Sequence, residues 1–344
     1  MAGIWTDQNK TMPGAYINFK TNSPISISMI DRGIVVILQH MEEGEKGTMY
    51  KVTPGENNFP EGADDSLAKE ALKGANTVYV YCLNNADEHD TEDITAALTA
   101  LKTLSFNVLV YPYTDSENTT VAAWVGQMRD EEGIKVQAVI PNYVADKEYI
   151  INPVQQIILE GNKTLELGAV AAYVGGITAG ANINESNTNK KYVGAIDVKP
   201  RMTKSEMEAA IKAGKYIFKV DNAQNVTSVY DINSLTTISP EKNKSFTKNR
   251  TIRTIDSINN DIVTIFESNY LGGKTSNTED GRSLLKSTLI EYFKELERMN
   301  AIQNFDEEKD VEVLEGNEKD TVVINTNIQT VDSIEKMFIT VNLS

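Results

Sequence analysis

Between residues 78 and 140, three apolar segments of strand length alternate with two segments of helical periodicity. The expected strands are residues 78–83, 106–111 and 135–140, and the expected helices are residues 93–104 and 120–130. A continuous apolar run at residues 34–38 predicts a further strand that is buried on both faces. Strands that alternate with helices over short connections form parallel β-α-β units with right-handed crossovers. The pattern therefore predicts an α/β fold, in which helices cover both faces of a parallel sheet.

The remainder of the chain mixes helical and strand patterns. Further expected helices are residues 155–178, 205–213, 250–270 and 282–299, of which the last two are long. Further expected strands are residues 216–220, 227–232, 311–314 and 321–328. Thr203 or Ser205 is expected to cap the short helix, and Gly214 is expected to end it. Over its whole length the chain is therefore expected to be α+β, with a parallel sheet domain followed by a mixed part.

Both ends of the chain alternate apolar and polar residues, as half-buried strands do. The two segments are Ala15, Tyr16, Ile17, Asn18 and Phe19 near the start, and Met337, Phe338, Ile339, Thr340 and Val341 at the end. A strand must pair its N–H and C=O groups in some sheet, either within its own subunit or in a neighbouring molecule. Residues 21–28 and 329–335 are the candidate linkers beside these strands. The pattern points to assembly rather than to catalysis.

Charge and cysteine content exclude several classes of protein. The net charge is −16, from 49 acidic and 33 basic side chains. This balance argues against a broad surface for nucleic acid or for an anionic membrane. The single cysteine, Cys82, cannot form an intramolecular disulfide, and its apolar neighbours indicate a packed, reduced thiol in a cytoplasmic protein. Neither a signal peptide nor a membrane span is expected, because no suitable apolar run occurs.

No segment carries a recognisable catalytic, cofactor or metal motif. The acidic run at residues 87–93 is best explained by the start of a helix, and a metal site around His89 is the less favoured alternative. His40 and His89 are too few for a multi-histidine zinc site. The small residues at 175–181 permit tight packing or a turn, whereas a phosphate loop would need a preceding strand. Residues 272–275 follow a helix and are expected to connect two helices. An α/β enzyme that binds a nucleotide or phosphate ligand remains the alternative interpretation.

Six segments of the chain, in order, carry a family resemblance. They are residues 8–19, 31–35, 67–83, 232–237, 246–253 and 331–341. Together they resemble the tail sheath proteins of contractile phages and of R-type bacteriocins, in particular the diffocin-like subgroup of Gram-positive prophages. Relatives often carry a β-rich insertion after the strand at residues 78–83, but here residues 84–90 lead almost directly into a helix. This departure indicates a minimal sheath subunit with little outer decoration.

The resemblance implies a structural subunit and not an enzyme. It implies that copies of the chain polymerise helically, with hexameric rings expected, around an inner tail tube and contract to drive the tube through a bacterial envelope. The implied partners are the tube, baseplate and tail terminator proteins, with no cofactor, no nucleic acid and no direct membrane contact. The chain would be made in the bacterial cytoplasm, assembled into a phage tail or bacteriocin particle, and released by lysis.

The resemblance also implies roles for particular segments. Family sheaths donate their terminal strands into a sheet of adjacent subunits, although pairing within one subunit is the alternative at both ends. The implied domains are residues 1–29 as N-terminal strand and linker, residues 30–231 as outer α/β domain, and residues 232–344 as assembly domain. This assembly domain would hold two long helices and a mixed sheet that the exchanged strands complete. Lys274, Arg282 and Lys286 are candidates to face an acidic tube, and a solvated helix face explains them equally well.

Overall fold

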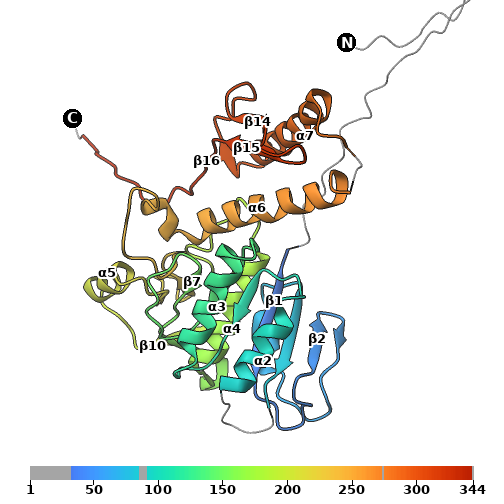
Figure 1. The fold of residues 1–344 in the computed structure, drawn as a ribbon. Helices are drawn as coiled ribbons and strands as arrows, with labels where there is room; N and C mark the ends of the chain where they lie inside the picture. Colours follow the sequence, from blue (N-terminus) through green and yellow to red (C-terminus); the bar gives the residue numbers. More distant parts are fainter. Residues whose placement is uncertain (1–31, 85–90, 273–274, 343–344) are drawn as a thin grey trace, which may run out of the picture. The chain divides into compact units, whose positions relative to one another are not determined.

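The computed structural model describes residues 32–84, 91–272 and 275–342 (Figure 1). These residues fall into two compact units. The α/β unit contains residues 32–264 and 330–342, and the C-terminal unit contains residues 265–329. The division lies inside one helix, α6 (Asn249–Asn269), so that helix contributes to both units. The functional boundary at residue 232 stays a prediction.

A seven-stranded sheet with the order β3-β2-β4-β1-β5-β6-β7 forms the centre of the α/β unit. Its strands are β1 (Ile34–Gln39), β2 (Met49–Thr53), β3 (Glu56–Asn57), β4 (Thr77–Cys82), β5 (Val108–Val110), β6 (Gln137–Val139) and β7 (Ile150–Ile151). Five neighbouring strands, β4, β1, β5, β6 and β7, are parallel, whereas β2 and β3 add an antiparallel edge. The predicted α/β fold is therefore confirmed.

Helices cover the sheet on both faces because its central strands are apolar on both. They are α1 (Ser66–Ala71), α2 (Thr91–Leu101), α3 (Asn118–Asp130) and α4 (Leu167–Gly180). Val35 and Ile37 of β1 belong to a core shared with α1 and α4, while Val36 and Leu38 belong to a second core shared with α2 and α3. Since successive side chains of a strand point to opposite faces, one strand supplies both cores.

The glycine run at residues 175–180 lies inside α4, where it lets this helix approach α1 closely. A Cβ atom at Gly176 would lie 2.0 Å from the carbonyl oxygen of Ala71, and one at Gly180 would lie 1.8 Å from that of Gly74. Only glycine leaves room for such backbone contacts. The tight-packing interpretation is confirmed, and a phosphate loop here is wrong.

The helix expected from residue 155 begins only at residue 167. The preceding residues instead form β8 (Gln156–Leu159), a 3-10 turn (Glu160–Asn162) and β9 (Thr164–Leu165). Gly161 has a φ of +79°, a left-handed conformation that glycine adopts without strain, and it reverses the chain so that Ile157 pairs with Leu165. The short apolar run at residues 157–159 is compatible with either a helix or a strand, and tertiary pairing decides the outcome.

The other elements that lie close to their predicted positions are α5 (Lys204–Lys212), β11 (Phe218–Val220), β12 (Val226–Ser228), α7 (Glu279–Arg298), β14 (Val311–Glu315) and β15 (Val322–Thr326). Three short strands have no counterpart among the predicted elements: β10 (Ala195–Lys199), β13 (Ile302–Gln303) and β16 (Gln329–Thr330). Thr203 caps α5 through a reciprocal capping box with Glu206, and Gly214 follows with a φ of +67°. In the C-terminal unit, Leu285, Leu289 and Phe293 of α7 are buried, as their spacing predicts.

We expect Gly176→Ala to lower the free energy of unfolding by about 1–3 kcal/mol, because the added methyl group overlaps backbone atoms of α1 that cannot move aside cheaply. Urea denaturation followed by circular dichroism measures this change. Gly55→Ala is the matched control, since a Cβ there meets nothing within 4 Å. Equal stability of the two variants would contradict the close approach of α4 to α1.

Asp146 stabilises the loop before β7 by accepting four hydrogen bonds from two neighbouring threonines. Its Oδ1 accepts from the backbone N–H of Thr236 at 2.6 Å and of Thr237 at 2.9 Å, and both hydroxyl groups donate to the same carboxylate. Partial burial raises the pKa of Asp146, but the hydrogen bonds from Thr237 and Thr236 outweigh it and hold that pKa well below its usual range.

A carboxyl group whose pKa is lowered by folding stabilises the protein above its unfolded pKa of about 4, and this stabilisation fades as the pH falls towards the folded value. We therefore expect Asp146→Asn to lower the free energy of unfolding by about 1 kcal/mol at pH 7 and by progressively less below pH 4. Thermal unfolding of both proteins from pH 7 to pH 3 measures the difference. A difference that grows in acid would refute this role of Asp146.

Candidate assembly surfaces

The C-terminal arm, residues 331–342, carries a run of strongly exposed apolar side chains. No helix or strand is formed along it, as Figure 1 shows. Phe338 is 94% exposed and Met337 is 77% exposed, and Ile339 and Val341 are similarly open. Burying one such side chain contributes about 1.5–3 kcal/mol, so a contiguous exposed set marks a contact surface. The role of these residues as a strand between subunits stays a prediction.

Polar contacts hold the first part of the arm to the α/β unit. The Glu335 carboxylate accepts hydrogen bonds from Thr188 Oγ1 at 2.6 Å and from Ser186 Oγ at 3.3 Å, and it forms an ion pair with Lys248 Nζ. Lys248 Nζ also lies 3.3 Å from Asp332, and Arg250 Nη1 donates to Ser333 Oγ at 2.7 Å. The prediction that residues 329–335 are a flexible linker is therefore wrong: Gln329 and Thr330 form β16, which pairs with β13, and Asp332, Ser333 and Glu335 contact the α/β unit. These contacts join residues far apart in the sequence, so they leave no local sequence signal.

The buried Lys248 side chain is held in its charged form. Burial lowers its pKa, but hydrogen bonds to Glu335 and to Tyr230 outweigh this effect and raise the pKa above its usual value. Nζ also lies 4.1 Å from the centre of the Tyr230 ring, within range of a cation–π interaction. The Glu335 carboxylate and the Tyr230 side chain therefore both stabilise the positive charge of Lys248.

The predicted tube-facing residues lie in the C-terminal unit, as far as the structure describes them. Arg282 of α7 donates to Asn277 Oδ1 at 3.0 Å, and its guanidinium lies 3.6 Å from Glu315. Lys286, one helical turn further along, is half-buried. Lys274 lies outside the described residues, as do Ala15, Tyr16, Ile17, Asn18 and Phe19. Contact with a tube stays a prediction for all of these residues.

The antiparallel ribbon of β14 and β15 offers open strand edges. Leu314 and Val323 lie opposite each other across the ribbon and are 43% and 44% exposed. In the described part of the chain, neither strand pairs with a third one. Unpaired backbone N–H and C=O groups on a strand edge form a docking site for a further strand. The sequence predicts both strands of the ribbon but gives no sign that their edges stay open.

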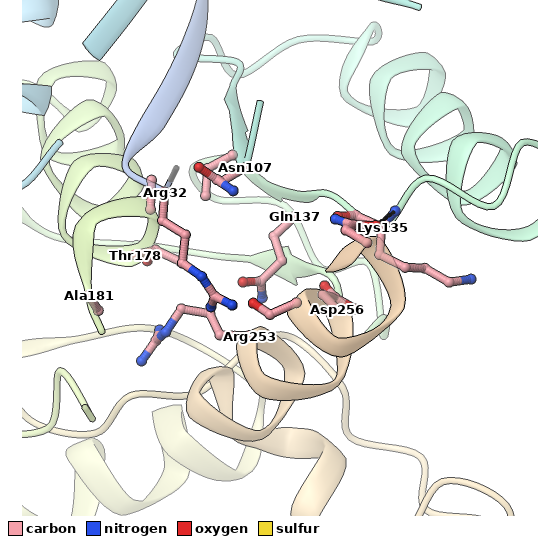
Figure 2. Close-up of a pocket in the computed structure, with 12 residues that line it drawn as sticks. Arg32, Asn107, Lys135, Gln137, Thr178, Ala181, Arg253 and Asp256 are labelled. Atoms are coloured by element: carbon pink, nitrogen blue, oxygen red, sulfur yellow. Dashed lines mark hydrogen bonds between the residues drawn. The ribbon is translucent and has the colours of Figure 1, made fainter. Parts of the chain in front are cut away.

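A polar cavity at the amino ends of β1, β5 and β6 is too small for an organic ligand. Figure 2 shows Arg32 and Gln137 directed towards its centre. Its volume is about 30 Å³, which holds one or two water molecules, whereas ligand pockets measure about 300–1,000 Å³. Ligands of open α/β sheets also bind at the opposite, carboxyl edge of the strands. This cavity therefore gives no support to a nucleotide-binding enzyme.

Other chemical features are equally unlike an active site. The Cys82 thiol is fully buried, and burial raises its pKa against a weaker opposing hydrogen bond with the backbone of Met41. Across residues 32–84, 91–272 and 275–342, His, Cys, Asp and Glu side chains form no cluster of three or more that could hold a metal ion. Within the same ranges, every helix is too short or too polar to cross a membrane.

Comparison with known proteins identifies the family. Residues 87–234 match the phage tail sheath protein central domain, and residues 241–344 match the phage tail sheath C-terminal domain. The chain therefore belongs to the phage tail sheath protein family, which confirms the resemblance to tail sheath proteins, while the diffocin-like subgroup stays a prediction.

Individual relatives match most of the chain. The Bacillus subtilis protein YqbK is 35% identical over 73% of the chain, but the match covers only 56% of YqbK, so the chain spans about half the length of such curated relatives. The tail sheath protein of Clostridium phage phiCD119 is 28% identical over 87% of the chain and 86% of its own length.

Solved structures of sheath proteins share the whole fold. The sheath tail protein of Desulfitobacterium hafniense is 30% identical, with a TM-score of 0.83 over 95% of this chain and 99% of that one. The contracted helical sheath of the anti-feeding prophage is 15% identical with a TM-score of 0.73 over 97% and 99% of the two chains, and this likeness concerns the fold alone.

We expect Cys82 to react with a disulfide reagent such as DTNB at least about 100-fold more slowly in the native protein than in denaturant, because its thiol is both inaccessible and poorly ionised. Absorbance of the released thiolate at constant pH measures both rates, and a cysteine-containing peptide in the same two solutions corrects for the denaturant. Rapid reaction of the native protein would contradict a purely structural Cys82.

Proposed function

We propose that this chain is a structural subunit of a contractile tail sheath. In this function, copies of the chain polymerise helically around an inner tube and then contract, which drives the tube through a bacterial envelope. Family membership and the fold shared with sheath tail proteins support the proposal. The observation that carries it is the C-terminal arm, whose apolar side chains lie exposed in the single chain.

The arm and the β14–β15 ribbon are complementary. In an extended segment, Met337, Ile339 and Val341 share one face because side chains alternate with a period of two residues. Added to the open edge of the ribbon in an adjacent copy, this face would be buried beside Leu314 and Val323. Backbone hydrogen bonds of the added strand would be kept while whole units rotate as rigid bodies. The N-terminal segment at residues 15–19 would act in the same way.

The remaining parts of the assembly follow from the same proposal. Rings of six copies would stack around the tube, and the baseplate and tail terminator proteins would close the two ends. Arg282, Lys286 and Lys274 would face an acidic tube surface. Contraction would release free energy stored at assembly, so neither a nucleotide nor another cofactor is needed. The chain would be made in the bacterial cytoplasm and would leave the cell by lysis as part of a phage tail or bacteriocin particle.

We expect the concentrated, purified chain to form hollow, striated cylinders of uniform width in negative-stain electron microscopy. Deletion of residues 337–344 is expected to abolish these cylinders, because it removes the strand that joins one copy to the next. Circular dichroism of the deleted chain controls for its folding. Cylinders that persist after the deletion would contradict strand exchange at the C-terminus.

Single substitutions within the arm sharpen this test. Ile339→Asp places a charge on the face expected to be buried and should reduce assembly at least about tenfold, since burying an unpaired charge is costly. Thr340→Asp adds the same charge on the opposite face and is the matched control. Sedimentation measures the polymerised fraction of each variant. Equal loss in both variants would refute the proposed orientation of the strand.

A further inference from the structure

The C-terminal arm belongs to the α/β unit, although it follows the C-terminal unit in the sequence. Residues 265–329 form the C-terminal unit, and residues 330–342 then join the compact unit formed by residues 32–264. The contacts of the arm lie with Ser186 and Thr188, before β10, and with Lys248 and Arg250, at the start of α6. Two segments that are distant in the sequence therefore hold residues 332–335, the first part of the arm.

Residues 332–335 are held to the α/β unit by charged and polar contacts and not by apolar packing. The side chains of Glu335 and Lys248 are 8% and 10% exposed, whereas the neighbouring apolar residue Ile334 is 96% exposed. This distribution is the reverse of ordinary burial, in which apolar groups enter the interior and charged groups stay in water. A buried charge is tolerated only when it is paired and hydrogen-bonded. Glu335 meets this condition through Lys248, Thr188 and Ser186.

The anchored residues differ sharply from those that follow. Asp332, Ser333 and Glu335 each contact a side chain of the α/β unit. From Met337 to Val341, the apolar side chains are more than half exposed. The part of the arm that is free to change direction therefore begins after Glu335.

We propose that the Lys248–Glu335 pair is an anchor that makes the C-terminal arm part of the α/β unit, so that a movement of this unit is passed through the arm to the neighbouring copy. This inference rests on the proposed sheath function and names the positioning residues of its C-terminal strand. Lys248 and Glu335 act by fixing the point from which the strand leaves the subunit.

Limited trypsin digestion of the unassembled chain tests the anchor directly. Cleavage after Lys336 requires the preceding residues to leave the α/β unit and to extend into the protease. We expect Glu335→Gln to release residues 337–344 at least about tenfold faster than the wild type, as measured by intact mass, with an unchanged midpoint of thermal unfolding. Glu307→Gln is the matched control, because it removes an ion pair with Lys294 in which both side chains are about half exposed.

Lys248→Met provides a second test from the other side of the pair, and it is expected to accelerate the same cleavage. Equal release rates in wild type, Glu335→Gln and Lys248→Met would overturn the anchor. A rate that rises only together with a fall in the unfolding midpoint would also overturn it, since that result would indicate a general loss of stability.

Electron microscopy then tests whether the anchor serves assembly. If the wild type forms uniform cylinders, we expect Glu335→Gln to form fewer cylinders with irregular axial spacing, while Glu307→Gln matches the wild type. Identical cylinders from Glu335→Gln would overturn the transmission of movement through the arm. If the wild type forms no cylinders with tube and baseplate proteins present, the proposed function fails, and the digestion experiment still decides whether the arm is anchored.

Discussion

The whole α/β unit depends on the need to cover β1 on two sides. Four consecutive residues of this strand, Val35 to Leu38, are inaccessible to solvent, and they alternate between two hydrophobic cores. A strand with that pattern is stable only between two layers, so helices must return to both faces. The approach of α4 to α1 through Gly176 and Gly180 brings one of these layers to full density. The connections, caps and polar contacts of the unit follow from this arrangement.

Ion pairs join the first half of α6 to the rest of the α/β unit. Arg129 of α3 holds Asp256 in a bidentate pair with both distances at 2.7 Å, and Arg253 lies 3.2 Å from the buried Asp231. Such pairs require defined partner positions, and removing one member leaves a buried charge without compensation. They therefore fix the orientation of α6 more strictly than apolar packing alone would, because apolar contacts tolerate sliding.

Local patterns in the sequence predict the parts of the fold that local physics decides. Apolar runs mark the parallel strands, and the Thr203 capping box marks α5. Residues 155–165 are mispredicted because a short apolar run fits both periodicities, and the reversal at Gly161 is chosen by pairing with β9. Contacts between residues far apart in the sequence leave no local pattern in it. For this reason the sequence predicts a linker at Glu335. The terminal segment at residues 15–19 lies outside the described structure and stays a prediction.

The two-stranded ribbon of β14 and β15 has a thermodynamic consequence for the chain as a whole. A ribbon of two strands is only marginally stable in water, whereas a third strand with an apolar face makes a sheet self-sustaining. If that strand comes from another copy, the stability of the ribbon follows mass action and rises with protein concentration. The free energy of unfolding is then no fixed property of one molecule. Dilution alone would loosen this ribbon, and crowding many copies together would complete the fold.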